Sequence, residues 1–81
     1  MTEYPIKTPQ QLGAVLKGYR RQRQLTQLSA GSQAGLAQNA ISEIEANPGP
    51  TSWARIFKVL AALDLEIVVR PRQGASSKAE W

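Results

Sequence analysis

A single glycine in the middle of this 81-residue chain, Gly35, separates two short stretches that both have helical patterning. Before it, Thr26 is a candidate N-cap for a helix of about 27–34, whose inward positions are mostly small residues. After it, the isoleucines of a stretch of about 38–46 share one helical face. Glycine commonly follows a helix C-terminus because it adopts left-handed dihedral angles without strain. The sequence therefore predicts two short helices joined by a tight turn.

A capping sequence precedes this pair of helices and predicts another helix of about 9–23. Thr8 can cap it, Pro9 suits its first position, and Gln11 completes a capping box. The apolar residues that follow recur at helical spacing and form one face. They are Leu12, Val15, Leu16 and Tyr19.

Two prolines and a glycine at 47–50 predict a turn before a last helix of about 52–63. Thr51 is the expected cap of this helix. We expect Trp53 to belong to the core, because it begins the apolar stripe of the helix. The stripe consists of Trp53, Ile56, Phe57, Leu60 and Leu63.

Residues 65–70 are β-branched in their centre and are followed by Pro71, which predicts a strand. A lone strand has no partner in its own chain, so its backbone N–H and C=O groups must pair elsewhere. The same strand of a second copy is the simplest partner and predicts a homodimer. The expected dimer strand contains Leu65, Ile67, Val68 and Val69, with Leu65, Ile67 and Val69 facing the helices.

The composition argues against several classes of function. The chain has no cysteine and no histidine, which removes disulfides, thiolate metal sites and the commonest general base. We therefore expect that the protein is not an enzyme and that it binds no metal and no cofactor. No apolar run approaches the ~20 residues needed to span a membrane, and the N-terminus lacks the pattern of a secretory signal. These features predict a cytoplasmic protein, and a core this small favours oligomerisation.

The charges are unevenly distributed along the chain, whose net charge is +4. Residues 1–25 carry a net charge of +4, residues 26–50 carry −2, and residues 51–81 carry +2. A basic domain favours a polyanionic partner. If that partner is a nucleic acid, phosphate attraction must come from the first and last thirds, and the middle third can read base edges only with neutral groups.

The residues of the central segment resemble the phage-repressor type of helix-turn-helix. The matching residues are Leu25, Thr26, Gln27, Gly35, Gln38, Ile41, Ser42, Ile44, Glu45 and Asn47. The resemblance covers about 9–63 and implies an all-α domain of four to five helices, here with one C-terminal β-strand pairing across a homodimer. The chain departs from the pattern at Ala30, Gly31 and Ala37. The first two departures affect how tightly the second helix packs, and Ala37 affects how well the third helix is capped.

The wider layout is similar to that of the HipB-type antitoxins. The features that match are Ile6 before the first helix, the capping sequence, the strand after the last helix, and a polar tail that ends in Glu80 and Trp81. This resemblance implies a homodimer that represses its own operon and binds a HipA-type serine/threonine kinase toxin. It also implies that Trp81 inserts into a pocket of that toxin. We expect residues 1–71 to form the DNA-binding and dimerisation domain and residues 72–81 a flexible tail.

The expected base-reading residues are Gln38, Asn39, Ser42 and Glu43. By helical period the first three point away from the two isoleucines of the third helix. Amides can pair bidentately with adenine, a serine hydroxyl can donate or accept, and a glutamate can accept from cytosine. A double-stranded operator with an inverted repeat is the expected partner.

The expected phosphate contacts come from the first two helices. In the resembling family, the residue at the position of Gln27 bonds a phosphate and steadies the glutamine here numbered 38. The same resemblance pairs Arg20 with Glu45 inside the fold, so Arg20 is expected to be structural. The other candidates for phosphate contacts are Lys17, Arg21 and Arg23.

Other hypotheses remain open at this point. The chain could be a solitary transcriptional regulator of the same fold, with Trp81 incidental or folded back onto its own domain. It could also be a protein-interaction module without DNA binding, because Glu43 is acidic and the third helix has no lysine or arginine.

Overall fold

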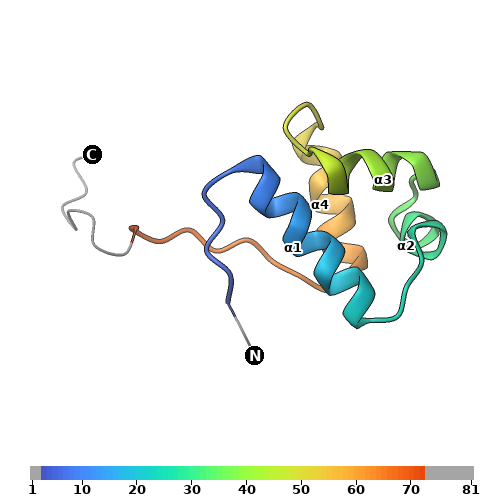
Figure 1. Ribbon diagram of the computed structural model, residues 1–81, viewed down its shortest axis with the longest axis horizontal. Helices are drawn as coiled ribbons and strands as arrows, with labels where there is room; N and C mark the ends of the chain where they lie inside the picture. The colour runs from blue at the N-terminus through green and yellow to red at the C-terminus, as the bar shows by residue number, and fades with distance from the viewer. Residues whose placement is uncertain (1–2, 73–81) are drawn as a thin grey trace.

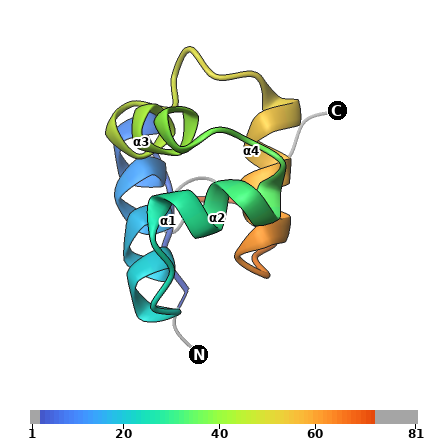
Figure 2. The same cartoon turned by 90° about the vertical axis from the view of Figure 1, so that its right-hand side faces the viewer.

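The computed structural model describes residues 3–72, and these residues contain four helices (Figure 1). The helices are α1 Pro9–Gln22, α2 Gln27–Ala34, α3 Gln38–Ala46 and α4 Trp53–Ala62. Helix α1 packs against α3, and α2 packs against both α3 and α4. The second view, at right angles to the first, shows α1 and α4 on opposite sides with α2 crossing between them (Figure 2). The all-α helix-turn-helix fold is confirmed.

The start of α1 has the predicted capping box. The Thr8 hydroxyl accepts from the Gln11 backbone N–H at 3.1 Å, and the Gln11 side chain accepts from the Thr8 N–H at 3.1 Å. Two backbone donors that the helix itself cannot pair are satisfied in this way. The helix ends at Gln22, within one residue of the predicted end.

The turn between α2 and α3 depends on two glycines. Gly35 has a φ of 73°, the left-handed conformation predicted from its position. The Leu36 N–H then donates to the Gly31 carbonyl at 2.8 Å and closes the turn. A Cβ on Gly31 would lie 2.5 Å from the Leu36 carbonyl oxygen. Gly31 departs from the family pattern, and its missing side chain allows the backbone of Leu36 to pack closely against α2.

Helix α4 begins one residue later than predicted. Its N-cap is Ser52, whose side chain accepts from the Arg55 N–H at 3.3 Å. The prediction of Thr51 as the cap was wrong. The Thr51 N–H donates to the Pro48 carbonyl at 3.0 Å, so Thr51 completes the preceding turn and Ser52 is left to cap the helix.

The core lies where the four helices meet. Its buried members are Leu16, Ile41, Ile44, Ile56, Val59, Leu60 and Leu63. Partly buried side chains pack around them: Leu12, Tyr19, Leu25, Leu36 and Leu65. On α2 only small residues are buried, and Leu28 lies on the surface with 63% of its area exposed.

Two aromatic residues of α4 are outside this core, contrary to prediction. Trp53 is 65% exposed and Phe57 is 54% exposed. Their rings lie beside each other, with centroids 6.1 Å apart. The buried side of α4 instead runs through Ile56 and Val59 to the end of the helix. Trp53 and Phe57 flank that side, and within residues 3–72 no other element covers them enough to bury them.

The chain leaves the bundle after α4 as an extended segment. Leu65 packs on the core, but Ile67 is 43% exposed and Val69 is 92% exposed. The prediction that all three face the helices was therefore wrong for Ile67 and Val69, which nothing within residues 3–72 covers. Residues 65–70 form no strand with other described residues of this single chain, so their pairing with a second copy stays a prediction.

The extended N-terminal segment crosses residues 65–72 in the view of Figure 1, and an ion pair joins the two segments. Glu3 accepts from Arg70 at 2.9 Å, an exposed ion pair that contributes little stability. Tyr4 meets Tyr19 of α1 edge to face, with ring centroids 5.9 Å apart. The N-terminal segment is thus held against α1 near the point where the C-terminal segment leaves.

Candidate nucleic-acid interface

The outer face of α3 carries all four predicted base-reading residues. Gln38, Asn39, Ser42 and Glu43 are exposed. The opposite face inserts the two isoleucines of α3 into the core, each 2% exposed. Because the buried face fixes the rotation of the helix about its axis, the four polar side chains are held together on one accessible surface.

The beginning of α3 has no side-chain cap, as the alanine at position 37 predicted. Ala37 makes no side-chain hydrogen bond, and the first helical N–H groups, those of Gln38 and Asn39, have no partner among residues 3–72. Unpaired N–H groups at a helix N-terminus favour an anionic or acceptor-rich partner. The uncapped end also carries both of the predicted base-reading amides, Gln38 and Asn39.

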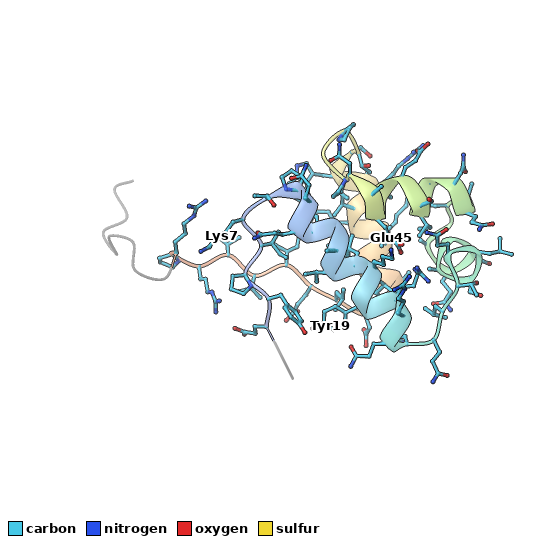
Figure 3. All side chains as sticks on the ribbon, in the orientation of Figure 1. Lys7, Tyr19 and Glu45 are labelled. Carbon is cyan, nitrogen blue, oxygen red and sulfur yellow. The ribbon has the colours of Figure 1, made fainter. Side chains whose placement is uncertain are left out.

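A buried ion pair connects α1 to α3, as the resemblance implied. Figure 3 labels Glu45, the member of the pair that lies on α3. The Arg20 Nε donates to Glu45 Oε2 at 2.5 Å, and Arg20 Nη2 donates to Glu45 Oε1 at 3.2 Å. The two side chains are only 10% and 6% exposed. Arg20 Nη1 also donates to the Leu25 carbonyl at 2.7 Å. All three guanidinium nitrogens of Arg20 therefore donate hydrogen bonds inside the fold.

Gln27 has a different partner from the one implied by the resemblance. Its Nε2 donates to Glu45 Oε1 at 3.2 Å, and no hydrogen bond joins it to Gln38 within the described residues. Gln27 is half-buried at the first position of α2. The ion pair of α1 and α3 therefore extends to the N-terminus of α2. Neither the phosphate contact of Gln27 nor its link to Gln38 is tested by these contacts.

The three predicted phosphate-binding cations differ in their surroundings. Lys17 and Arg21 are exposed one turn apart on α1 and have no ion-pair partner within residues 3–72. Arg23 lies beyond the end of α1, and its Nη1 donates to the Leu63 carbonyl at 3.2 Å. Arg23 is thus tied to the end of α4, which leaves Lys17 and Arg21 as the freer pair.

Arg55, which was not among the predicted site residues, lies near α3 in space. A shallow groove between the end of α3 and the start of α4 is lined by Glu43, Ala46, Asn47, Pro50, Thr51, Ser52 and Arg55. Arg55 is exposed and comes three residues after the cap of α4. The sequence signal that could have indicated Arg55 is the predicted turn at 47–50. This turn brings the chain back beside α3 and places Arg55 near a helix that has no lysine or arginine.

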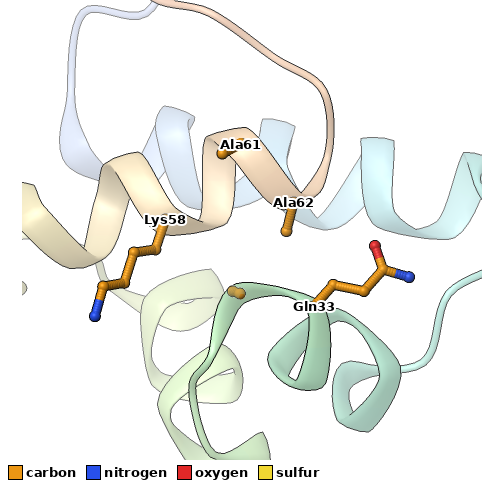
Figure 4. A pocket seen from close by; sticks show the side chains of 5 residues that line it. Gln33, Lys58, Ala61 and Ala62 are labelled. Carbon is orange, nitrogen blue, oxygen red and sulfur yellow. The ribbon is translucent and has the colours of Figure 1, made fainter.

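A second shallow hollow lies between α2 and α4 (Figure 4). Its lining consists of Gln33, Ala34, Lys58, Ala61 and Ala62. It brings together one amide and one ammonium group but no carboxylate. In the part of the chain that the structure describes, no cluster of three or more potential metal ligands occurs. Among the same residues, no helix has the length and apolar character needed to cross a membrane.

Comparison with known proteins places this arrangement in a family. The sequence matches no protein-family model. It is 34% identical over 79 residues to the antitoxin HipB of Escherichia coli O6:H1, and the match covers 98% of this chain and 84% of the relative. The chain belongs to the HipB family of antitoxins. The HipB of Escherichia coli K12 is 32% identical, again over 98% of this chain.

Solved structures of HipB agree with the fold described above. A HipB variant in complex with an O2 20-mer superposes with a TM-score of 0.82 at 31% identity, covering 86% of this chain and 97% of that chain. HipB in a HipA–HipB–O2–O3 complex gives a TM-score of 0.81 at 32% identity. A restriction-modification controller protein has a TM-score of 0.69 at 21% identity, which is evidence for the fold alone.

Proposed function

We propose that this chain is a sequence-specific DNA-binding antitoxin. It represses its own operon by placing α3 in the major groove of an inverted-repeat operator. The observation that carries the proposal is the outer face of α3, where four side chains able to bond base edges are exposed together on a rigid helix. Membership in the HipB family supports it, since solved HipB structures include a complex with an O2 20-mer and a HipA–HipB–O2–O3 complex.

The polar residues of this surface have separate roles in the proposal. Gln38 and Asn39 bond adenine, Ser42 donates to or accepts from a base, and Glu43 accepts from a cytosine amine. Contacts to the DNA backbone come from Gln27, from the cations Lys17, Arg21 and Arg23, and from Arg55. Arg55 lines the same groove as Glu43. Contacts to phosphate set the register of the protein on DNA, whereas contacts to bases select the sequence.

The active form in this proposal is a homodimer. Residues 65–70 pair with the same segment of a second copy, which satisfies their backbone groups. Trp53 and Phe57 form an apolar surface on α4 that a second copy would cover, and their exposure supports this assembly. The two α3 helices would then lie about one DNA turn apart, ~34–36 Å, which suits an inverted repeat.

The proposed toxin contact is Trp81, at the end of the segment expected to be a tail. This residue lies outside the described part of the chain, so the proposal rests on the family resemblance and on chemistry. An indole that inserts into a pocket hides ~150–250 Å² of mainly apolar surface and can dominate the affinity of a short segment. The partner in this proposal is a HipA-type serine/threonine kinase. The chain itself acts by binding and catalyses no reaction.

A solitary regulator of the same fold is the alternative, and family membership does not favour it. Two binding experiments separate the alternatives. A mobility-shift titration of the chain's own promoter, with scrambled DNA as the control, should give a retarded complex only with the promoter. Addition of a purified HipA-type kinase from the same organism should retard that complex further. If no promoter complex forms, the DNA-binding proposal is wrong and the chain is a protein-interaction module. If the promoter complex forms but the kinase does not retard it further, the chain is a solitary regulator.

A further inference from the structure

The buried Arg20–Glu45 ion pair has a second bonded neighbour that its structural role does not require. Glu45 Oε1 accepts from Gln27 Nε2 at 3.2 Å as well as from Arg20. The Glu45 side chain is 6% exposed, whereas Gln27 is half-buried at the surface-facing start of α2. A carboxylate inside the fold is therefore bonded directly to an amide at its surface.

The bond constrains how the Gln27 amide is oriented. A primary amide has two N–H donors and one acceptor oxygen, while an ionised carboxylate only accepts. The Glu45 oxygen must therefore meet the nitrogen of the amide, and the second N–H is turned away from the carboxylate. That second N–H has no hydrogen-bond partner among residues 3–72.

Arg20 makes the carboxylate suitable for this task. The guanidinium holds both oxygens of Glu45 and is itself fixed by the Leu25 carbonyl, so the acceptor cannot rotate away from Gln27. The positive charge of Arg20 also offsets a carboxylate that would otherwise repel a nearby phosphate. Three elements of the fold, α1, α2 and α3, thus meet at one oriented amide.

We propose that Glu45, held by Arg20, is a positioning residue for DNA binding that presents the free N–H of Gln27 to a backbone phosphate. The inference rests on the proposed function and adds to it how the phosphate contact is pre-oriented. Preorganisation raises affinity because a side chain that is already ordered loses less conformational freedom on binding. Glu45 in this role touches no DNA and acts only through Gln27.

A double-mutant cycle on operator affinity tests the coupling. Glu45→Asp keeps the charge beside Arg20 but withdraws the carboxylate by one methylene from Gln27. Gln27→Ala should lower operator affinity roughly tenfold in the parent, equivalent to about 1.4 kcal/mol. In the Glu45→Asp background, the same change should lower it by no more than about twofold. Gln33→Ala, on the other end of α2, is the matched control and should change neither background.

A second readout needs no DNA and separates positioning from stability. Nitrogen relaxation of the side-chain amides in the free parent should show Gln27 to be markedly more ordered than the exposed Gln33. If Glu45→Asp folds, it should release Gln27 without affecting Gln33. Equal mobility of the two amides in the parent would overturn the inference, even if the Glu45 variant fails to fold.

The outcomes distinguish this inference from the proposed function. A parent that binds its promoter with additive Gln27 and Glu45 effects overturns the positioning role and leaves the antitoxin proposal intact. A parent that binds no promoter DNA overturns both. A non-additive cycle together with an ordered Gln27 amide supports both.

Discussion

Replacement of Gly13 by alanine tests the close approach of α1 to the end of α3. The position of the outer face of α3 depends on this packing. Gly13 is buried, and a Cβ there would lie 2.5 Å from the Glu45 carbonyl oxygen and 3.1 Å from that of Ile44. Both obstacles are backbone atoms, so a side-chain rotation cannot relieve the overlap. Gly18 is the matched control, because a Cβ on it meets nothing within 4 Å in the same helix.

The expected magnitude follows from comparing the two variants. Each alanine should gain the same ~0.5–1 kcal/mol, because glycine is a poor residue in a helix interior. Only the alanine at position 13 should also lose the ~1–3 kcal/mol typical of overpacking. At roughly 4–8 °C per kcal/mol, Gly13→Ala should therefore melt at least about 4 °C below Gly18→Ala.

The assay is thermal unfolding of both variants followed by circular dichroism. Both are measured at the same total chain concentration, since the proposed dimerisation would make the melting temperature depend on it. Gly18→Ala should melt about 2–8 °C above the parent, whereas Gly13→Ala should melt at or below the parent. Equal melting temperatures for the two variants would refute the close packing of α1 on α3.

Three further predictions concern the proposed contacts. Arg21→Ala should weaken binding to all DNA sequences about equally and reduce the salt slope by ~1, as measured by anisotropy titrations at several salt concentrations; a loss confined to the operator would contradict a phosphate role. Val68→Pro should remove a ladder donor and shift sedimentation toward the monomer, and an unchanged dimer would count against pairing through residues 65–70. Deletion of Trp81 should weaken toxin binding but leave operator affinity unchanged; equal toxin affinity would exclude the anchor, and lost DNA binding would make Trp81 part of the fold.

The elements of this fold that the sequence predicted well are those with local chemical signals. The capping box of Thr8 and Gln11 and the left-handed Gly35 each act over a few residues, so their consequences could be worked out without the tertiary structure. The bounds of α2 and α3 followed from such signals. Where two adjacent hydroxyl residues could both cap a helix, as at Thr51 and Ser52, local reasoning had no basis for choosing correctly.

Burial and side-chain partners depended on tertiary packing and were harder to predict. Trp53 and Phe57 satisfy the helical spacing of a core stripe, but they flank the side of α4 that meets the other helices. The bond between Gln27 and Glu45 joins residues 18 positions apart, and nothing in the local sequence indicates it. Arg55 was missed because its position near α3 arises from the turn between α3 and α4 rather than from its neighbours in sequence.

The central claim is that the outer face of α3 reads the operator. Its most direct test is a titration of the native promoter, and of single-base-pair variants of it, with the parent, Gln38→Ala and Gln33→Ala. Gln38→Ala should lower promoter affinity by ~1–3 kcal/mol and relax the preference at one base position. Gln33→Ala, which removes an exposed amide from α2, should behave like the parent. Unchanged affinity and base preference after the Gln38 substitution would contradict the account.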